Sequence, residues 1–140
     1  MIKKWKLCLV RQQGWIPDLI CWFTGSEWNH VAIQMADGNF LDLDRPGLRV
    51  IERDDYLSMN KILVTDWFVG EKIALKRMKR FGHMTYGDLD NVAYVLYQLV
   101  GWRLDFASEN SSNCVSFCLR FLGVHPKHAN CLAPKDMQNL

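Results

Sequence analysis

The 140-residue sequence lacks any apolar run long enough to cross a bilayer. Its longest candidates, residues 16–23 and 92–102, carry polar side chains and fall short of the roughly 18–20 residues that a spanning helix needs. The basic first residues precede a stretch too polar for the core of a signal peptide, and a small-residue cleavage site is missing. We therefore expect no transmembrane segment and a cytoplasmic location, with secretion by another route left open.

An excess of charge of one sign is also missing. Seventeen lysine and arginine residues against 15 aspartate and glutamate residues leave a net charge of +2, which gives little attraction for the phosphates of DNA or RNA. We expect no nucleic-acid partner. With 49% hydrophobic residues the chain is too apolar to be disordered, and its length fits a single domain over residues 1–140.

Cysteine spacing typical of a disulfide framework is absent as well. The five cysteines are an odd number, at Cys8, Cys21, Cys114, Cys118 and Cys131, so we expect reduced thiols. His125, His128 and Cys131 follow at intervals of three, but Pro126 interrupts a regular helix there and no zinc-binding motif accompanies them. We predict neither a metal site nor a cofactor.

Hydrophobic periodicity and turn residues predict an α+β fold. Strands are expected over residues 5–10, 30–35, 40–44, 48–51 and 61–68, with a turn at Asp37-Gly38. Helices are expected over residues 17–23, 71–81, 88–102 and 114–122, and from about residue 134 onward. The strands would form a central antiparallel sheet with helices on either side of it in the sequence.

Three residues in this arrangement, His30, Asp42 and Cys114, combine an imidazole, a carboxylate and a thiol. His30 begins one expected strand and Asp42 lies on the next, so the turn between them brings them together across adjacent strands, where opposing Cβ atoms lie about 4.5–5.5 Å apart. A carboxylate beside an imidazole sets its tautomer and stabilises its charged form. Asp44 points to the same side of its strand as Asp42 and is the alternative partner.

Cys114 is the candidate nucleophile because it begins an expected helix. A helix N-terminus and a nearby histidine both lower the pKa of a thiol, and the unpaired amides of the first turn can bind an oxyanion. Cys118 lies one turn later and is assigned to packing, and Cys8 and Cys21 have no comparable setting. Asn113 is a candidate helix cap.

Several motifs resemble those of the circularly permuted NlpC-type papain-like proteins, over roughly residues 12–138. The similar segments are residues 14–20, Thr24-Gly25-Ser26, His30-Val31-Ala32-Ile33, Asp37-Gly38, Phe40-Leu41-Asp42, Tyr86-Gly87-Asp88 and Pro134-Lys135-Asp136-Met137. Asn113-Cys114-Val115-Ser116-Phe117 resembles the cysteine box of the YiiX/YebB-like branch and that of the lecithin retinol acyltransferase branch. Val115 departs from the serine or glutamate usual after the cysteine.

The resemblance implies a papain-like half-barrel with Cys114 as nucleophile, His30 as base and Asp42 as the residue that orients His30. Tyr86 and Asn113 are further candidates for binding substrate or an oxyanion. The implied activity is cleavage of an amide, isopeptide or acyl-ester bond through a thioester, with a peptide, peptidoglycan-like or acyl-lipid substrate. Two alternatives stay open: acyl transfer of the lecithin retinol acyltransferase type, and a non-catalytic binding module.

Overall fold

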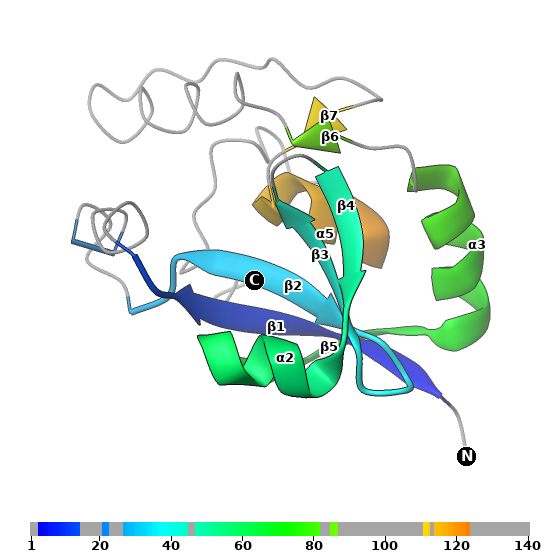
Figure 1. The fold of residues 1–140 in the computed structure, drawn as a ribbon. Helices are drawn as coiled ribbons and strands as arrows, with labels where there is room; N and C mark the ends of the chain where they lie inside the picture. Colours follow the sequence, from blue (N-terminus) through cyan, green and yellow to red (C-terminus); the bar gives the residue numbers. More distant parts are fainter. Residues whose placement is uncertain are drawn as a thin grey trace.

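The protein is an α+β fold built on one mixed sheet (Figure 1). The computed structural model describes residues 3–14, 21–22, 27–44, 47–81, 85–86, 111–112 and 114–123. Its strands are β1 (Lys4–Gln12), β2 (His30–Gln34), β3 (Phe40–Asp44), β4 (Gly47–Ile51), β5 (Asn60–Gly70), β6 (Thr85–Tyr86) and β7 (Ser111–Ser112). Their order is β5-β1-β2-β3-β4-β6-β7, antiparallel throughout except for the short parallel pair β6–β7.

Three helices accompany the sheet in the described part of the chain: α2 (Arg53–Met59), α3 (Glu71–Phe81) and α5 (Cys114–Leu122). The five predicted strands and the predicted helices 71–81 and 114–122 are confirmed, as is the turn before β3, where Gly38 has a φ of +94°. That backbone conformation is strained for any residue with a Cβ atom, which explains the glycine. None of the helices in the described segments is long and apolar enough to cross a membrane.

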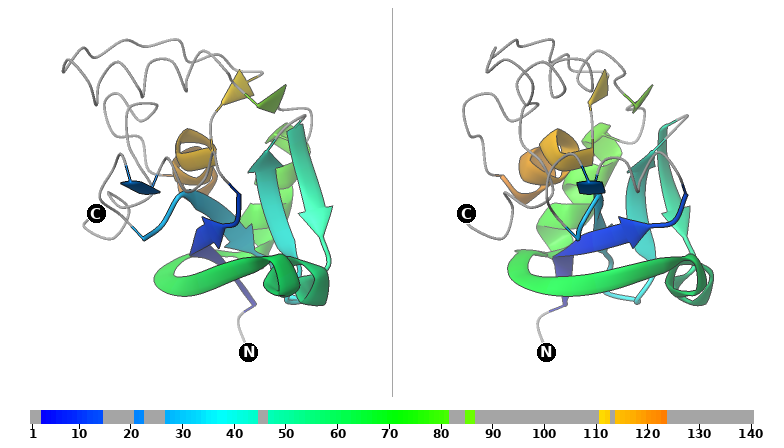
Figure 2. Two further views of the ribbon diagram at one scale, coloured as in Figure 1. Left: turned by 60° about the vertical axis from the view of Figure 1, so that its left-hand side comes forward. Right: turned by 90° about the vertical axis from the view of Figure 1, so that its left-hand side faces the viewer.

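Successive side chains along β1, β2 and β3 point to opposite faces of the sheet, so the buried residues form two clusters, one on each face. One face packs against α5 and α3 through the larger cluster, which includes Trp5, Leu7, Leu9, Val31, Ile33, Leu41, Leu43, Ala74, Phe117, Leu119 and Phe121. The other face packs against α2 through Cys8, Val10, Ala32, Phe40 and Tyr56. Figure 2 shows the sheet lying between α5 and α2. Strand β3 is therefore buried on both sides, although its alternating sequence predicted a half-buried strand.

The end of α5 is fixed to the rest of the core. The Phe121 ring stacks on Trp5 of β1, with ring centroids 5.7 Å apart. Arg77 of α3 donates a hydrogen bond to the Phe121 carbonyl, so a cationic side chain satisfies one of the last carbonyls of the helix. Gly123 follows with a φ of +82°, the left-handed conformation that commonly ends helices.

Helix α2 and the two-residue strands β6 and β7 were not predicted. The α2 sequence has few apolar residues, and only Tyr56 is buried, so it has no apolar stripe to mark it as a helix. The helices expected at 88–102 and from 134 onward lie outside the described residues. Of the helix expected at 17–23, residues 21 and 22 are described and are helical.

The packing of α5 predicts a large loss of stability on truncating its buried aromatic residue. Phe121→Ala should lower the free energy of unfolding by about 3–5 kcal/mol, because it removes a fully buried ring and leaves a cavity. Phe68→Ala on β5 is the matched control, since the same atoms are removed from a ring that is 50% exposed. Urea unfolding of both variants measures the difference, and equal losses would contradict this packing.

Candidate active site

His30 begins β2, and its backbone is held where β1 ends and β2 begins. His30 pairs with Val10 in the β1–β2 ladder. Just before it, Asn29 extends the pairing with its side chain: Oδ1 accepts a hydrogen bond from the Gln12 amide at 2.8 Å, and Nδ2 donates to the Gln12 carbonyl at 3.0 Å. These bonds fix the backbone where the chain enters β2. His30, which is only 4% exposed, therefore extends its ring from a rigid backbone.

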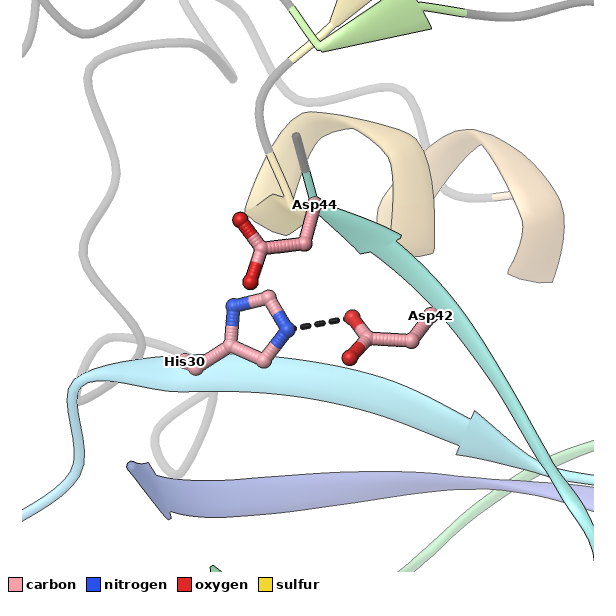
Figure 3. A group of neighbouring side chains, drawn as sticks. All are labelled: His30, Asp42 and Asp44. Atoms are coloured by element: carbon pink, nitrogen blue, oxygen red, sulfur yellow. Dashed lines mark hydrogen bonds and ion pairs between the residues drawn. The ribbon is translucent and has the colours of Figure 1, made fainter. Parts of the chain in front are cut away.

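The imidazole of His30 meets the carboxylate of Asp42. His30 Nε2 and Asp42 Oδ1 form a buried hydrogen bond and ion pair (Figure 3). The two residues are close, as predicted, but they are diagonal neighbours: continuing the register from the Ile33–Leu41 pair would set Asp44 opposite His30. No β2–β3 pairing is present beyond Ile33–Leu41 in these described strands, which diverge so that the ring lies between them (Figure 3).

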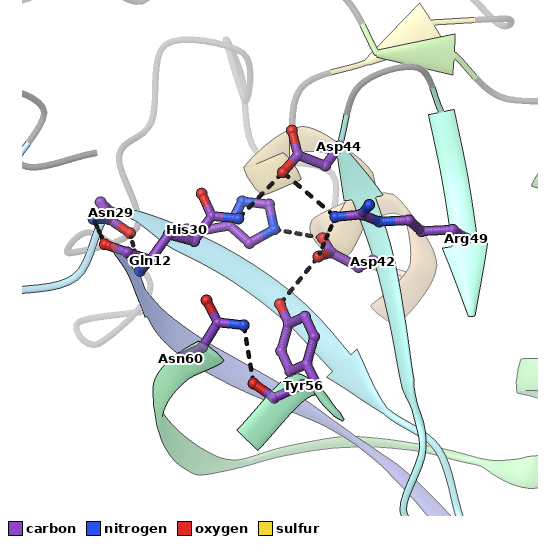
Figure 4. Close-up of polar contacts among 8 residues, drawn as sticks. All are labelled: Gln12, Asn29, His30, Asp42, Asp44, Arg49, Tyr56 and Asn60. Carbon is purple, nitrogen blue, oxygen red and sulfur yellow. Dashed lines mark hydrogen bonds and ion pairs between the residues drawn. The ribbon is translucent and has the colours of Figure 1, made fainter. Parts of the chain in front are cut away.

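Asp42 is completely buried, and three side chains that donate hydrogen bonds or carry positive charge surround its carboxylate. Besides His30, the Tyr56 hydroxyl donates to Oδ2 at 3.1 Å, and Arg49 Nη2 lies 3.9 Å from the same oxygen (Figure 4). Burial by itself raises the pKa of Asp42, but the charge and hydrogen bond of His30, the Tyr56 hydroxyl and Arg49 together hold that pKa below its ordinary value of 3.8. Asp42 is therefore a carboxylate at neutral pH.

Asp44 lies at the outer margin of the same group. Its side chain is 32% exposed, its Oδ2 accepts a hydrogen bond from Gln12 Nε2 at 3.2 Å, and Arg49 Nη2 lies 3.8 Å away. Because Asp42 Oδ1 is the carboxylate oxygen hydrogen-bonded to His30 Nε2, the geometry favours Asp42 over Asp44 as the residue that orients the imidazole.

One side-chain group in the described part of the chain has the composition of a metal site. The ligand atoms of His30, Asp42 and Asp44 all lie within 4.8 Å of one another. Arg49, however, places a guanidinium nitrogen within 4 Å of both carboxylates and so already supplies positive charge there. The donor set of the three residues is used in an ion-pair network that does not favour a divalent cation. The predicted absence of a metal at His125, His128 and Cys131 concerns residues outside the described part.

A cavity of about 510 Å³ adjoins this network on the α2 side of the sheet. Asp42, Asp44 and Arg49 line it together with Gln12, Gln13, Ser58 and Asn60, and Ile51, Tyr56 and Met59 complete the wall. The carboxylate that holds His30 thus lies at the wall of a cavity large enough for a small molecule or a short peptide segment. Most of the lining side chains offer hydrogen-bonding groups, in contrast to a channel for an acyl chain.

Strand pairing places the chain that leads into α5 near the same end of the sheet. Asp44 pairs with Gly47, Gly47 with Thr85, and Thr85 with Ser111, which gives a continuous row across four strands. Adjacent strands lie roughly 4.8 Å apart, so about 14 Å separate Asp44 from Ser111. Cys114, the first residue of α5, follows three positions later.

The direction of α5 agrees with this row. Phe121, near the end of the helix, stacks on Trp5 at the start of β1, whereas His30 pairs with Val10 near the other end of that strand. The helix therefore runs from the His30 end of the sheet toward the Trp5 end, with Cys114 at its beginning. Helix α5 packs on the face of the sheet opposite to Tyr56.

The other described cysteines have environments of structural residues. Burial raises the pKa of the Cys8 thiol to about 12, and the buried Cys21 Sγ lies 3.4 Å from the Glu27 carbonyl, to which it donates. Cys118 is buried in the core against the sheet. These three are free thiols, and none has the exposed, cationic surroundings of a nucleophile, in agreement with the sequence-based assignment.

Two further residues, Tyr86 and Asn113, were predicted to belong to the site. Tyr86 lies on β6, where its backbone pairs with Ser112, two positions before Cys114. Asn113 lies outside the described residues. The structure thus brings His30 and Asp42 together, and it places the backbone of Cys114 at the helix start that was predicted for it.

Two members of the network, Tyr56 and Arg49, were not identified from the sequence. Arg49 is directly opposite Asp42 in the β3–β4 ladder, so the predicted hairpin could have indicated it. Tyr56 depends on α2, whose one sequence signal is the pair of acidic residues Asp54 and Asp55 in its first turn. That signal is too short to predict which side chain would point at the sheet.

Comparison of the chain with protein-family models, curated proteins and solved structures finds no match. The resemblance to the permuted NlpC-type proteins therefore stays a prediction.

The low pKa of Asp42 predicts a pH-dependent contribution to stability. At pH values between the pKa of Asp42 in the folded protein and 3.8, the unfolded chain binds more protons at this residue than the folded protein does. The stabilisation from Asp42 is therefore complete well above pH 3.8, and it is lost as the pH falls through the pKa of the folded protein. Asp42→Asn should cost about 3 kcal/mol at pH 7, because it removes the charged partner of His30, and the cost should shrink on acidification.

Urea unfolding between pH 3 and pH 7 measures this difference. Asp54→Asn is the matched control, because its carboxylate is 81% exposed and its ion pair with Arg53 lies on the surface. The account of Asp42 is contradicted if the cost of Asp42→Asn stays constant over this range.

Proposed function

We propose that this protein is a papain-like cysteine hydrolase that uses Cys114, His30 and Asp42. The observation that carries the proposal is the buried His30–Asp42 pair at the end of the sheet from which α5 starts. An ionised carboxylate on Nε2 keeps the proton of a neutral imidazole on that nitrogen, so Nδ1 has the lone pair of a base. Cys114, as the first residue of α5, belongs to the turn whose amides lack helical partners.

The reaction follows from these roles. His30 Nδ1 takes the proton of the Cys114 thiol, and the thiolate attacks the carbonyl carbon of the substrate. First-turn amides of α5 bind the oxyanion of the tetrahedral intermediate. The imidazolium protonates the leaving amine or alcohol as its bond to the carbonyl breaks, which leaves a thioester on Cys114. His30 then takes a proton from water as the water oxygen attacks the thioester carbonyl. When this second intermediate collapses, the C–S bond breaks, the acid is released and the imidazolium returns its proton to the Cys114 sulfur.

Asp42 stays ionised throughout this cycle. Its low pKa fits that role, because the carboxylate stabilises the imidazolium without accepting its proton. The hydrogen bond from Tyr56 and the nearby Arg49 further compensate the buried negative charge while His30 is neutral.

The polar lining of the adjoining cavity supports a peptide-like substrate over an acyl lipid. Gln12, Gln13, Ser58 and Asn60 offer hydrogen bonds that match amide groups, and Arg49 suits a carboxylate. We therefore place amide or isopeptide hydrolysis first and acyl-ester chemistry second. The free thiols of Cys8, Cys21 and Cys118 fit the reducing cytoplasm as the working compartment.

A pH-resolved alkylation experiment tests the proposed nucleophile. At pH 6 the Cys114 thiol should react with iodoacetamide at least about tenfold faster than in His30→Ala, because a thiolate stabilised by an imidazolium persists where an ordinary thiol is protonated. Peptide mass spectrometry with fragmentation between residues 114 and 118 locates the label. Cys118, on the same helix and buried, is the internal control.

Equal labelling of Cys114 in the wild type and in His30→Ala would refute the proposed thiol–imidazole pair. If the nucleophile is found, an acyl-trapping probe applied to the purified protein in a cell lysate retains the acyl group on Cys114, and its mass distinguishes a peptide from a fatty acyl chain. An added alcohol or amine that accepts the acyl group faster than water would identify acyl transfer instead of hydrolysis.

A further inference from the structure

Tyr56 provides a hydrogen bond that the proposed reaction does not itself require. It is the one buried residue of α2, with 1% of its surface exposed, and its hydroxyl donates to Asp42 Oδ2 at 3.1 Å (Figure 4). The opposite oxygen of the same carboxylate, Oδ1, bonds to His30 Nε2. Asp42 is therefore held at both oxygens by groups from two different elements of the fold.

A carboxylate bound at one oxygen alone keeps rotational freedom. The terminal torsion of aspartate is broad, so the Asp42 carboxylate could turn about its Cβ–Cγ bond while remaining near His30. A second donor on Oδ2 restricts this rotation and keeps the lone pairs of Oδ1 directed at Nε2. Hydrogen bonds to an ionised acceptor are stronger than neutral ones, and more so where water is excluded.

Tyr56 is itself rigidly held, as a residue that positions another must be. Its ring stacks on Phe40 of β3, with centroids 4.5 Å apart and an interplanar angle of 24°. Its amide donates to the Glu52 carbonyl at 3.0 Å, and its carbonyl accepts a hydrogen bond from Asn60 Nδ2 at 3.0 Å. The hydroxyl thus reaches Asp42 from a fixed ring on a short helix anchored at both ends.

We infer that Tyr56 is a positioning residue of the proposed active site, which fixes the Asp42 carboxylate so that His30 keeps its proton on Nε2 and presents Nδ1 to Cys114. The inference rests on the proposed function for its catalytic consequence. Its structural half, the control of the His30 tautomer, is independent of whether Cys114 reacts.

Tyr56→Phe is the direct test, because it keeps the ring on Phe40 and removes only the hydroxyl. We expect the rate of Cys114 alkylation at pH 6 to fall roughly tenfold, the effect of losing one hydrogen bond to a charged group. Nitrogen-15 NMR of the His30 ring near neutral pH should show the Nε2–H form in the neutral ring of the wild type and a mixture of Nδ1–H and Nε2–H forms in the variant.

Two control variants separate positioning from packing. Phe40→Leu removes the stacked ring but not the hydroxyl, so it should lower stability while shifting the His30 tautomer less than Tyr56→Phe does. Leu57→Ala changes a neighbouring residue of the same helix that is 40% exposed and does not line the cavity, so both readouts should stay at wild-type values. Should Tyr56→Phe fail to fold, Tyr56→4-aminophenylalanine keeps a donor at the same place and should retain the wild-type tautomer.

The two readouts fail in distinguishable ways. A wild-type tautomer and a wild-type alkylation rate in Tyr56→Phe would overturn the inference and leave the proposed function standing. A mixed tautomer already present in the wild-type neutral ring would also overturn it, as would a mixture in Tyr56→4-aminophenylalanine. If Cys114 shows no acceleration over His30→Ala in the wild type, the proposed function fails, while the NMR measurement still decides whether Tyr56 controls the His30 ring.

Discussion

The structure depends on keeping one negative charge inside the sheet. Asp42 lies on a strand that is buried on both faces, where an isolated carboxylate would be costly, and its environment compensates that charge from three sides. His30 comes from the neighbouring strand β2, Arg49 from β4 and Tyr56 from α2. Because each partner belongs to a different element, the local arrangement of strands and helix is coupled to the charge state of one residue.

The same network lies where we propose that the chemistry takes place. Beyond Ile33 and Leu41 the ladder between the described parts of β2 and β3 ends, and the strands diverge beside the His30 ring. One face has the polar cavity and α2; the other has α5, which starts at this end of the sheet. The proposed thiol hydrolysis uses this proximity of a base, a polar cavity and a helix N-terminus.

The sequence predicted those parts of the molecule that have a local signal. Strands with apolar or alternating residues, the turn at Gly38 and the end of α5 at Gly123 are all marked by their own residues. The His30–Asp42 pair was predictable because one short turn connects the two strands. The diagonal offset of that pair, the burial of Asp42 and the contact with Tyr56 depend on strand divergence and on packing of α2, which no local pattern records.

In the proposed active site the thiol of Cys114 meets the imidazole of His30, and the most direct test is the distance between Cys114 Sγ and His30 Nδ1 in a crystal structure of the reduced protein. We predict a separation of about 3–4 Å, within reach of a direct proton transfer or slightly looser in the absence of substrate. A sulfur atom enclosed on the α5 side of the sheet, with strand backbone between it and the ring, would contradict the account.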